Sequence, residues 1–290
     1  MFLNRREPAD ARIVCETFVA IGGIDPISCR HVRITNCDIS TCDDGICPKA
    51  SKSPCEDVVV SNCKVESKTA ALKLGTGSSG DFRHIRFEHC VLHHSVTGIC
   101  FELKDGGTAE DITFSDIQMD ITTNKYFASP IFLDIDQRTP DSKISHIRNI
   151  TMENMTIQTG SGIVIQGRPD SIIESLTLRN LTLRVVRADS YDLRRKAIGN
   201  GDINLPPKPS DTLYARLPAY CSFAYVRGLH LDDVHVEIAP SAYAAFPRSA
   251  VCGRELEDAV LSRVTRVPAA AVSVPVIDLQ NCTNVQTTEQ

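Results

Sequence analysis

The sequence feature that most constrains the fold is a short segment that recurs along the chain. Each copy alternates apolar and polar residues, and the clearest copies are Cys29–Cys37, Cys55–Cys63 and Phe82–Cys90. The penultimate positions of successive copies are often about 26 residues apart, and a repeat of that length indicates a solenoid of stacked coils. These penultimate residues are Asn36, Asn62, His89, Asp116, Asn154, Asn180, Asp233 and Arg263.

A second segment follows each clear copy after about ten residues. It begins with a small residue and then alternates apolar residues with others, as in Ala71–Gly75, Gly98–Glu102 and Gly162–Gln166. This period of two is typical of a half-buried strand rather than a helix. Two short strands per coil predict an all-β fold, a right-handed parallel β-helix of about eight to ten coils. Equivalent residues of successive coils then stack about 4.8 Å apart.

The composition suits one solenoid domain spanning residues 1–290. Apolar residues make up 42% of the chain, which is enough for a continuous core. The net charge of −5, with both signs mixed along the chain, gives no indication of nucleic-acid binding. The chain has no long apolar run, so we expect no membrane span. We expect a monomer that uses no cofactor and no metal.

Two stretches depart from the repeat. Residues 1–20 are charged and lack the apolar centre of a signal peptide, so the localisation stays open. We expect them to be an irregular segment, either an improvised cap over the first coil or part of a longer product. Residues 187–220 contain Gly199–Gly201 and Pro206–Pro207, and this polar stretch predicts a long inserted loop.

Five of the cysteines follow the repeat. Cys37, Cys63 and Cys90 share one position and predict an inward ladder of small side chains, and Cys29 and Cys55 predict another. Stacked cysteines could reach disulfide distance, but we expect free thiols. The sequence has no Cys-x-x-Cys pair, so a zinc site is not predicted.

The outward residues of the second strand are the candidate functional groups, and we refer to them as the outer stripe. Strand alternation predicts that they stack along one exposed face. Asp43 and Asp44 lie in the turn that enters this strand, so six charged residues converge there. They are Asp25, Asp43, Asp44, Lys49, Lys73 and Glu102.

Paired carboxylates on a rigid surface are what glycosidic cleavage requires, because one donates a proton to the leaving oxygen and the other activates water. Two simpler interpretations remain open. Asp43 and Asp44 could form an ordinary polar turn, and the two lysines and Glu102 could be solvated surface residues. We expect His31, His84 and His89, at repeat positions, to be surface or ladder residues, and His93 and His94 to lie in a solvated turn.

Three segments resemble one enzyme family. Gly23–Ile34, Cys42–Ile46 and Leu72–Thr76 are similar, in order and spacing, to glycoside hydrolase family 28, which contains the polygalacturonases. The resemblance implies a pectin-lyase-like β-helix that hydrolyses plant-cell-wall polysaccharide with inversion, using three aspartates. It makes Asp43 the general acid and Asp44 one of two carboxylates that activate water, about 6.5–9.5 Å from the acid. Similar enzymes are usually secreted or periplasmic.

The chain departs from the family pattern at several positions. The third aspartate falls on Gly22, and the glycine-flanked histidine falls on Ala70. The Arg-x-Lys pair that would hold a galacturonate carboxylate falls on Cys100 and Glu102. Lys73 could partly replace that pair. Asp25 could replace the lost aspartate only if the chain bends there. We therefore expect an altered substrate or a weakened enzyme.

Two other functions fit the same sequence. The missing carboxylate at Gly22 favours a non-catalytic carbohydrate-binding protein or a truncated relative of the enzymes. A polysaccharide lyase on the same scaffold needs an arginine or lysine base and usually calcium. Lys73 beside Asp44 leaves this third alternative open.

Overall fold

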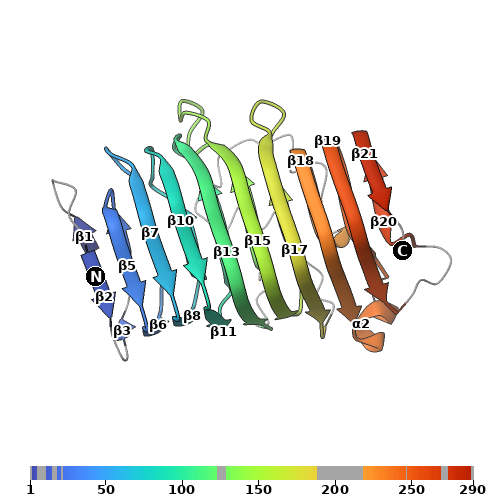
Figure 1. Ribbon diagram of the computed structural model, residues 1–290, viewed down its shortest axis with the longest axis horizontal. Helices are drawn as coiled ribbons and strands as arrows, with labels where there is room; N and C mark the ends of the chain where they lie inside the picture. The colour runs from blue at the N-terminus through green and yellow to red at the C-terminus, as the bar shows by residue number, and fades with distance from the viewer. Residues whose placement is uncertain are drawn as a thin grey trace.

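The chain forms a parallel β-helix, as the repeat predicted. A computed structural model describes residues 22–122, 129–187, 218–245, 247–268 and 274–288, together with the backbone of residues 2–4, 11–14 and 18–20. Its strands lie side by side from one end of the molecule to the other (Figure 1). Successive coils pair in parallel with a constant register; for example, Ile85 of one coil pairs with Val58 of the preceding coil and with Ile112 of the next.

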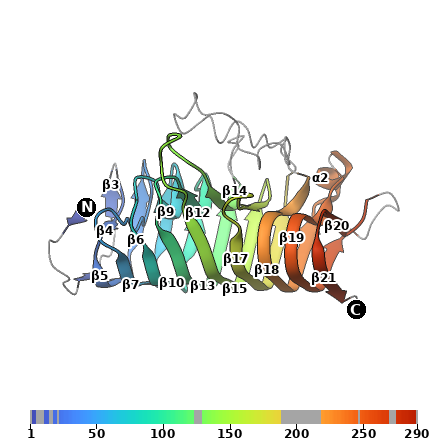
Figure 2. The same cartoon turned by 90° about the horizontal axis from the view of Figure 1, so that it is seen from above.

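Each coil has three faces rather than the two expected from the sequence. The repeated segment forms the first face and the second segment forms the third face, which lie on different sides of the molecule in Figure 2. Between them, a short strand follows the penultimate residue of the repeat and forms a second face. The sequence interpretation missed this strand because it is only three or four residues long in the early coils.

The faces comprise the following strands. The first face contains β2 (Ala11–Val14), β5 (Arg30–Thr35), β7 (Cys55–Ser61), β10 (Phe82–Glu88), β13 (Thr108–Ile121), β15 (His146–Thr159), β17 (Ile173–Val185), β18 (Ala219–Ile238), β19 (Ser249–Val267) and β21 (Thr283–Thr288). The second face contains β3 (Phe18–Ala20), β6 (Asp38–Thr41), β8 (Lys64–Ser67) and β11 (Val91–His93), and β13 and later long strands continue it. The third face contains β1 (Phe2–Asn4), β4 (Asp25–Ile27), β9 (Ala70–Gly75), β12 (Thr97–Leu103), β14 (Ser129–Ile135), β16 (Ile163–Gln166), the beginnings of β18 and β19, and β20 (Ile277–Gln280).

A left-handed residue explains the polar end of the repeated segment. All eight penultimate residues, from Asn36 to Arg263, have φ between 50° and 58°. Asparagine, aspartate and histidine adopt this conformation more readily than most residues. The residue turns the chain from the first face to the second, and the cysteine that follows it in the clear copies is buried, as at Cys37 and Cys63. A second series, which includes His31, also has positive φ at the start of the first face.

The small residue before the third face is required by close packing between coils. A Cβ on Gly45 would lie 2.5 Å from the carbonyl oxygen of Ala71 in the next coil, and one on Gly98 would lie 2.6 Å from that of Pro130. Inside the coils, stacked aliphatic and aromatic side chains form one continuous core, in which Phe87 stacks on Phe114 with ring centroids 4.8 Å apart. Such interior ladders bury the apolar half of each strand.

The described cysteines agree with the expected ladders. Cys29, Cys37, Cys55, Cys63 and Cys90 are all buried, and all are thiols outside disulfide bonds. Burial raises the pKa of Cys55 to about 12, so this thiol stays neutral and unreactive at physiological pH.

The N-terminal expectation was wrong in one respect. Within residues 1–20, the strands β1, β2 and β3 pair in parallel with β4, β5 and β6, so their backbone continues the repeat. The cause is geometric, because β5 and β6 present unpaired backbone groups on which a further coil can pair whatever its side chains are.

The expected loop at 187–220 lies almost entirely outside the described residues, and its last two residues belong to β18. One short helix, α2 (Pro240–Ala245), follows β18. None of the described helices has the length and apolar character needed to cross a bilayer.

Candidate functional site

The third face carries the outer stripe in the register expected from the sequence. Lys73 in β9 pairs with Cys100 in β12, which pairs with Phe132 in β14. Two positions further along the strand, Glu102 pairs with Asp134. The parallel ladder therefore stacks equivalent outward residues of successive coils, as strand alternation predicted.

Lys73 joins two of the candidate carboxylates. Its Nζ lies 3.0 Å from Oδ2 of Asp44 and 3.4 Å from Oε2 of Glu102. The side chains of Lys73 and Asp44 are only 12% and 15% exposed. Burial alone would lower the pKa of Lys73, but Cys100, Glu102 and Asp44 outweigh it and raise this pKa well above its usual value. Lys73 is therefore a permanent cation at physiological pH.

The other oxygen of Asp44 is also hydrogen bonded. Oδ1 accepts a bond of 2.7 Å from the hydroxyl of Thr69 and one of 3.4 Å from the backbone N–H of Ala70. Donors from the next coil thus hold both carboxylate oxygens, which fixes the orientation of the side chain. Thr69 was not identified from the sequence, although it lies 25 residues after Asp44 and therefore about one coil later.

Asp43 occupies the same turn but a different environment. Its backbone carbonyl accepts hydrogen bonds from the hydroxyls of Ser67, at 2.7 Å, and Thr41. Its backbone N–H donates to the Thr41 hydroxyl at 3.1 Å. The residue itself is exposed, and the structure does not bring its carboxylate into the cluster around Lys73. The turn is therefore rigid while the Asp43 side chain faces solvent.

Lys49 and Asp25 form a second pair on the stripe, with 2.9 Å between Nζ and Oδ2. The buried thiol of Cys47 is close to both candidate pairs. Burial, followed by the charges of Asp44 and Asp25, raises the pKa of Cys47 well above 9.0. This thiol is therefore neutral at physiological pH, so it carries no negative charge that would balance the ammonium groups of the lysines.

The expectation that the whole stripe is exposed was wrong. Asp25 and Glu102 are only 8% and 4% exposed. Further along the stripe, Cys100, Phe132 and Val164 belong to a second apolar cluster on the outer side of the third face. Every residue of β12 and β14 is buried, so these strands are covered on both faces. Strand alternation predicts which residues point outward, but it does not reveal whether another part of the protein covers them.

Beyond Glu102, the covered part of the outer stripe contains two further polar residues, Asp134 and Gln166. Gln166 donates a hydrogen bond of 2.9 Å from Nε2 to Oδ1 of Asp134, and both side chains are buried. Among the candidate residues, Asp43 is exposed and Asp44, Lys49 and Lys73 are half-buried. The part of the site that a substrate can reach therefore lies at the N-terminal end of the stripe.

Three positions at which the chain departs from the family pattern are Gly22, Ala70 and Cys100. Among the described residues, no atom lies within 4 Å of a Cβ added to Gly22, the position at which the sequence resemblance placed a third aspartate. Ala70 contributes its backbone N–H to Asp44, as described above. Cys100 is buried in the apolar cluster, so this position offers no cation to an acidic sugar.

The histidines of the repeat lie at the surface, as expected. His31, His84 and His89 have half or more of their side chains exposed, and each lies within 3.6 Å of an aspartate in the next coil. Each also has a positive φ, which explains why a histidine recurs at these corners.

Comparisons with known proteins point to one group of enzymes. An endo-polygalacturonase from Pectobacterium carotovorum subsp. carotovorum is 24% identical over 165 residues, which are 56% of this chain and 40% of that protein. An endo-polygalacturonase from Pectobacterium parmentieri is 22% identical over the same length and with the same coverage. The chain thus spans about two fifths of the length of the curated relatives it matches. No protein-family model matches the chain.

Solved structures give the same result for the fold. A family 28 exopolygalacturonase from Yersinia enterocolitica superposes with a TM-score of 0.54 at 14% identity, covering 91% of this chain and 43% of that one. An exopolygalacturonase from Thermotoga maritima superposes with a TM-score of 0.51 at 20% identity, covering 58% and 40%. The resemblance seen in the sequence segments is thereby confirmed: the chain is polygalacturonase-like in sequence and has the parallel β-helix fold of these enzymes.

Proposed function

We propose that this protein is a glycoside hydrolase that cleaves pectic or related plant-cell-wall polysaccharide with inversion. The observation that supports this most is the Asp44 carboxylate, which Thr69 and Lys73 hold in a fixed orientation beside the exposed Asp43. The similarity to polygalacturonases supports the same class of reaction. In this proposal Asp43 is the general acid and Asp44 is the general base.

The reaction follows from these two roles. Asp43 transfers its carboxyl proton to the glycosidic oxygen as the bond to the anomeric carbon breaks. Asp44 takes a proton from a water molecule whose oxygen bonds to the anomeric carbon from the opposite side. The products are two shorter sugar chains, one with a new reducing end. Proton exchange with solvent then returns Asp43 to its acid form and Asp44 to its carboxylate form.

The charges of the site favour a substrate with few free carboxylates. Lys73 is already paired with Asp44 and Glu102, and Lys49 is paired with Asp25. Among these five side chains, three carboxylates face two ammonium groups. A free uronate would add a further negative charge, whereas a methyl ester would not. We therefore propose that methyl-esterified pectin is a better substrate than polygalacturonate.

The test is release of reducing ends from both polymers. The wild type is expected to cut, Asp44→Asn to lose about two or more orders of magnitude in rate, and Asp43→Asn to lose a similar factor. Asp111→Asn is the matched control, because Asp111 is an exposed carboxylate on the first face. If the wild type cuts nothing in a broad glycan panel, or if Asp44→Asn is as active as the control variant, the proposal is wrong.

A second candidate function is carbohydrate binding without cleavage. It is supported by the absence of a carboxylate at Gly22 and by the burial of Asp25 and Glu102. This function predicts that pectic oligosaccharides bind the wild type and Asp44→Asn with similar affinity, while neither protein releases reducing ends. Calorimetric titration of both proteins with the same oligosaccharides separates the two candidates.

The lyase alternative loses support in this geometry. A lyase base has to be uncharged to remove a proton, yet the pKa of Lys73 is raised well above its usual value. Lys73 is therefore better suited to hold Asp44 than to accept a proton. Unsaturated uronate products in the same assay would show that this assignment is wrong.

A further inference from the structure

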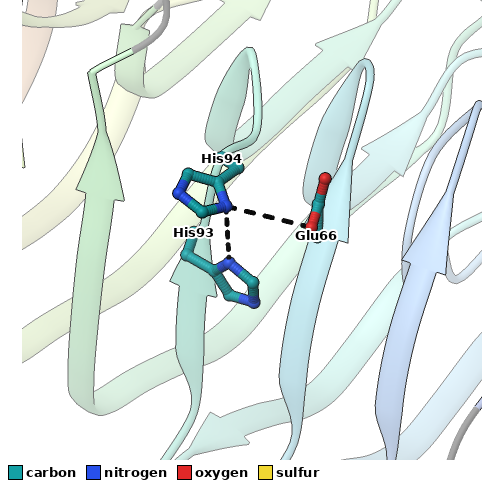
Figure 3. Close-up of side chains that lie close together, drawn as sticks. All are labelled: Glu66, His93 and His94. Atoms are coloured by element: carbon teal, nitrogen blue, oxygen red, sulfur yellow. Dashed lines mark hydrogen bonds and ion pairs between the residues drawn. The ribbon is translucent and has the colours of Figure 1, made fainter.

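A separate group of potential metal ligands lies on the second face of the β-helix. Glu66 lies in β8, His93 ends β11 in the next coil, and His94 follows it. One ligand atom from each of the three side chains lies within 4.8 Å of the other two. Figure 3 shows the two imidazoles side by side, with the Glu66 carboxylate on the neighbouring strand.

The backbone brings the two histidines together. Consecutive residues of a strand normally point to opposite faces, which would separate the imidazoles. His94 has φ of 51°, and its backbone N–H donates to the carbonyl of Asp120 in the following coil at 3.1 Å. This left-handed turn lets Nδ1 of His93 and Nδ1 of His94 lie 3.2 Å apart. Nδ1 of His94 is also 3.9 Å from Oε2 of Glu66.

We propose that Glu66, His93 and His94 bind a divalent transition-metal ion such as Zn2+, which would link two successive coils. Two imidazole nitrogens and one carboxylate oxygen form a ligand set that suits such ions. An ion about 2.1 Å from both nitrogens would subtend an N–metal–N angle of roughly 100°. To complete three sites of a tetrahedron, Glu66 would have to move closer to the imidazoles, because its Oε2 lies 3.9 Å from Nδ1 of His94 and the three ligand atoms are within 4.8 Å of one another. Water would occupy the open position.

The charged surroundings are compatible with these ligands. Burial, Lys64 and His94 lower the pKa of His93, while Glu66 and Asp38 oppose this shift. The hydrogen bond from Lys68 lowers the pKa of Glu66. Both shifts are in the direction that favours the metal-binding forms, the neutral imidazole and the carboxylate.

Lys68 is the main competitor for the ion. Its Nζ lies 2.7 Å from Oε1 of Glu66, so it occupies one carboxylate oxygen and adds a positive charge near the site. The oxygen nearer His94 is Oε2. A bound ion would share Glu66 with Lys68 or displace it, so removal of this lysine should strengthen metal binding.

The test is calorimetric titration of the full chain with Zn2+. All proteins carry Cys42→Ser, because Cys42 is an exposed thiol that could bind zinc by itself. We expect saturable binding of one ion per chain. His94→Asn and Glu66→Gln should each weaken it by about tenfold or more. Asparagine tolerates the positive φ of position 94, so the fold is kept.

Two further variants make the test specific. His89→Asn is the matched control, because His89 is also exposed, has φ of 55° and lies near a carboxylate; it should bind as the parent does. Lys68→Gln should bind more tightly. Zn2+ should also raise the melting temperature of the parent and the control by more than that of Glu66→Gln. Absence of saturable binding, or equal binding by His94→Asn and His89→Asn, would overturn the proposal. The readouts are independent of glycan cleavage.

Discussion

Nζ of Lys73 lies 3.0 Å from Oδ2 of Asp44, and the two residues belong to successive coils. The ion pair is largely buried, and the same ammonium group also lies 3.4 Å from Glu102. One cation thus contacts two carboxylates on the third face. The position of the candidate base therefore depends on a residue one coil away.

We predict that Lys73→Met destabilises the protein by about 3 kcal/mol, because two carboxylates in a largely buried position lose an ammonium partner. Urea unfolding measures the change. The pKa of Lys73 in the folded state is raised above 10.5. The stabilisation that its positive charge provides is therefore fully present below pH 10.5, and it is lost only as the pH rises through the folded-state pKa. The difference between variant and wild type should thus be constant from pH 7 to about 9. Lys49→Met removes a more exposed ion pair and should lower the free energy of unfolding by less. An equal decrease for the two variants would contradict the role of burial at Lys73.

Gly22→Asp is expected to increase hydrolysis. A Cβ at this position has no atom of the described residues within 4 Å, and the resemblance to family 28 places the third aspartate there. The new carboxylate would help Asp44 to activate water. Rates of reducing-end release from pectin measure the effect, and Gly22→Asn is the matched control of the same size without a negative charge. Equal rates for the two variants would mean that a carboxylate at position 22 does not contribute.

Residues at the corner between the first and second faces should tolerate only certain side chains. Asn62 is exposed and has φ of 54°. Asn62→Val should lower the free energy of unfolding by about 1–2 kcal/mol, because a β-branched residue is strained in the left-handed region. Asn62→Gly should be close to neutral. Lys64→Val, at an exposed position of β8, is the control and should have little effect in thermal or urea unfolding.

Asp105 should make the stability depend on pH in the acidic range. It receives two hydrogen bonds from Arg138, at 2.8 and 2.9 Å, and one from the N–H of Gly77 at 3.0 Å. Burial opposes ionisation, but Arg138 and Gly77 outweigh it and lower the pKa of Asp105 below 3.8. The stabilisation is therefore present above pH 3.8 and is lost as the pH falls through the lower folded-state pKa.

Asp105→Asn should consequently be less stable than the wild type at pH 6, and the difference should shrink below pH 3.8. Urea unfolding across this range measures both values. Asp141→Asn is the control, since Asp141 is exposed in a neighbouring turn. A pH-independent difference for Asp105→Asn would show that the contribution of this residue is not ionic.

The architecture could be predicted from the sequence because a parallel solenoid repeats its chemistry at a constant spacing. The eight penultimate residues from Asn36 to Arg263 all have a left-handed conformation. The register that stacks Lys73 beside Cys100 also followed from counting residues. The second face did not, because its strands in the early coils have too few residues to show a periodic pattern.

The sequence by itself determined which residues point into the coils and which point outward, since strand alternation is a local property of the backbone. Only the tertiary structure decided which outward residues reach solvent. Asp43 is exposed while Glu102 is buried, although both were assigned to one open face. The tertiary structure also placed Glu66 beside both His93 and His94, because the left-handed conformation of His94 lets the two consecutive imidazoles approach each other. Burial and convergence depend on segments far apart in the chain, and one sequence does not specify how such segments cover or approach each other.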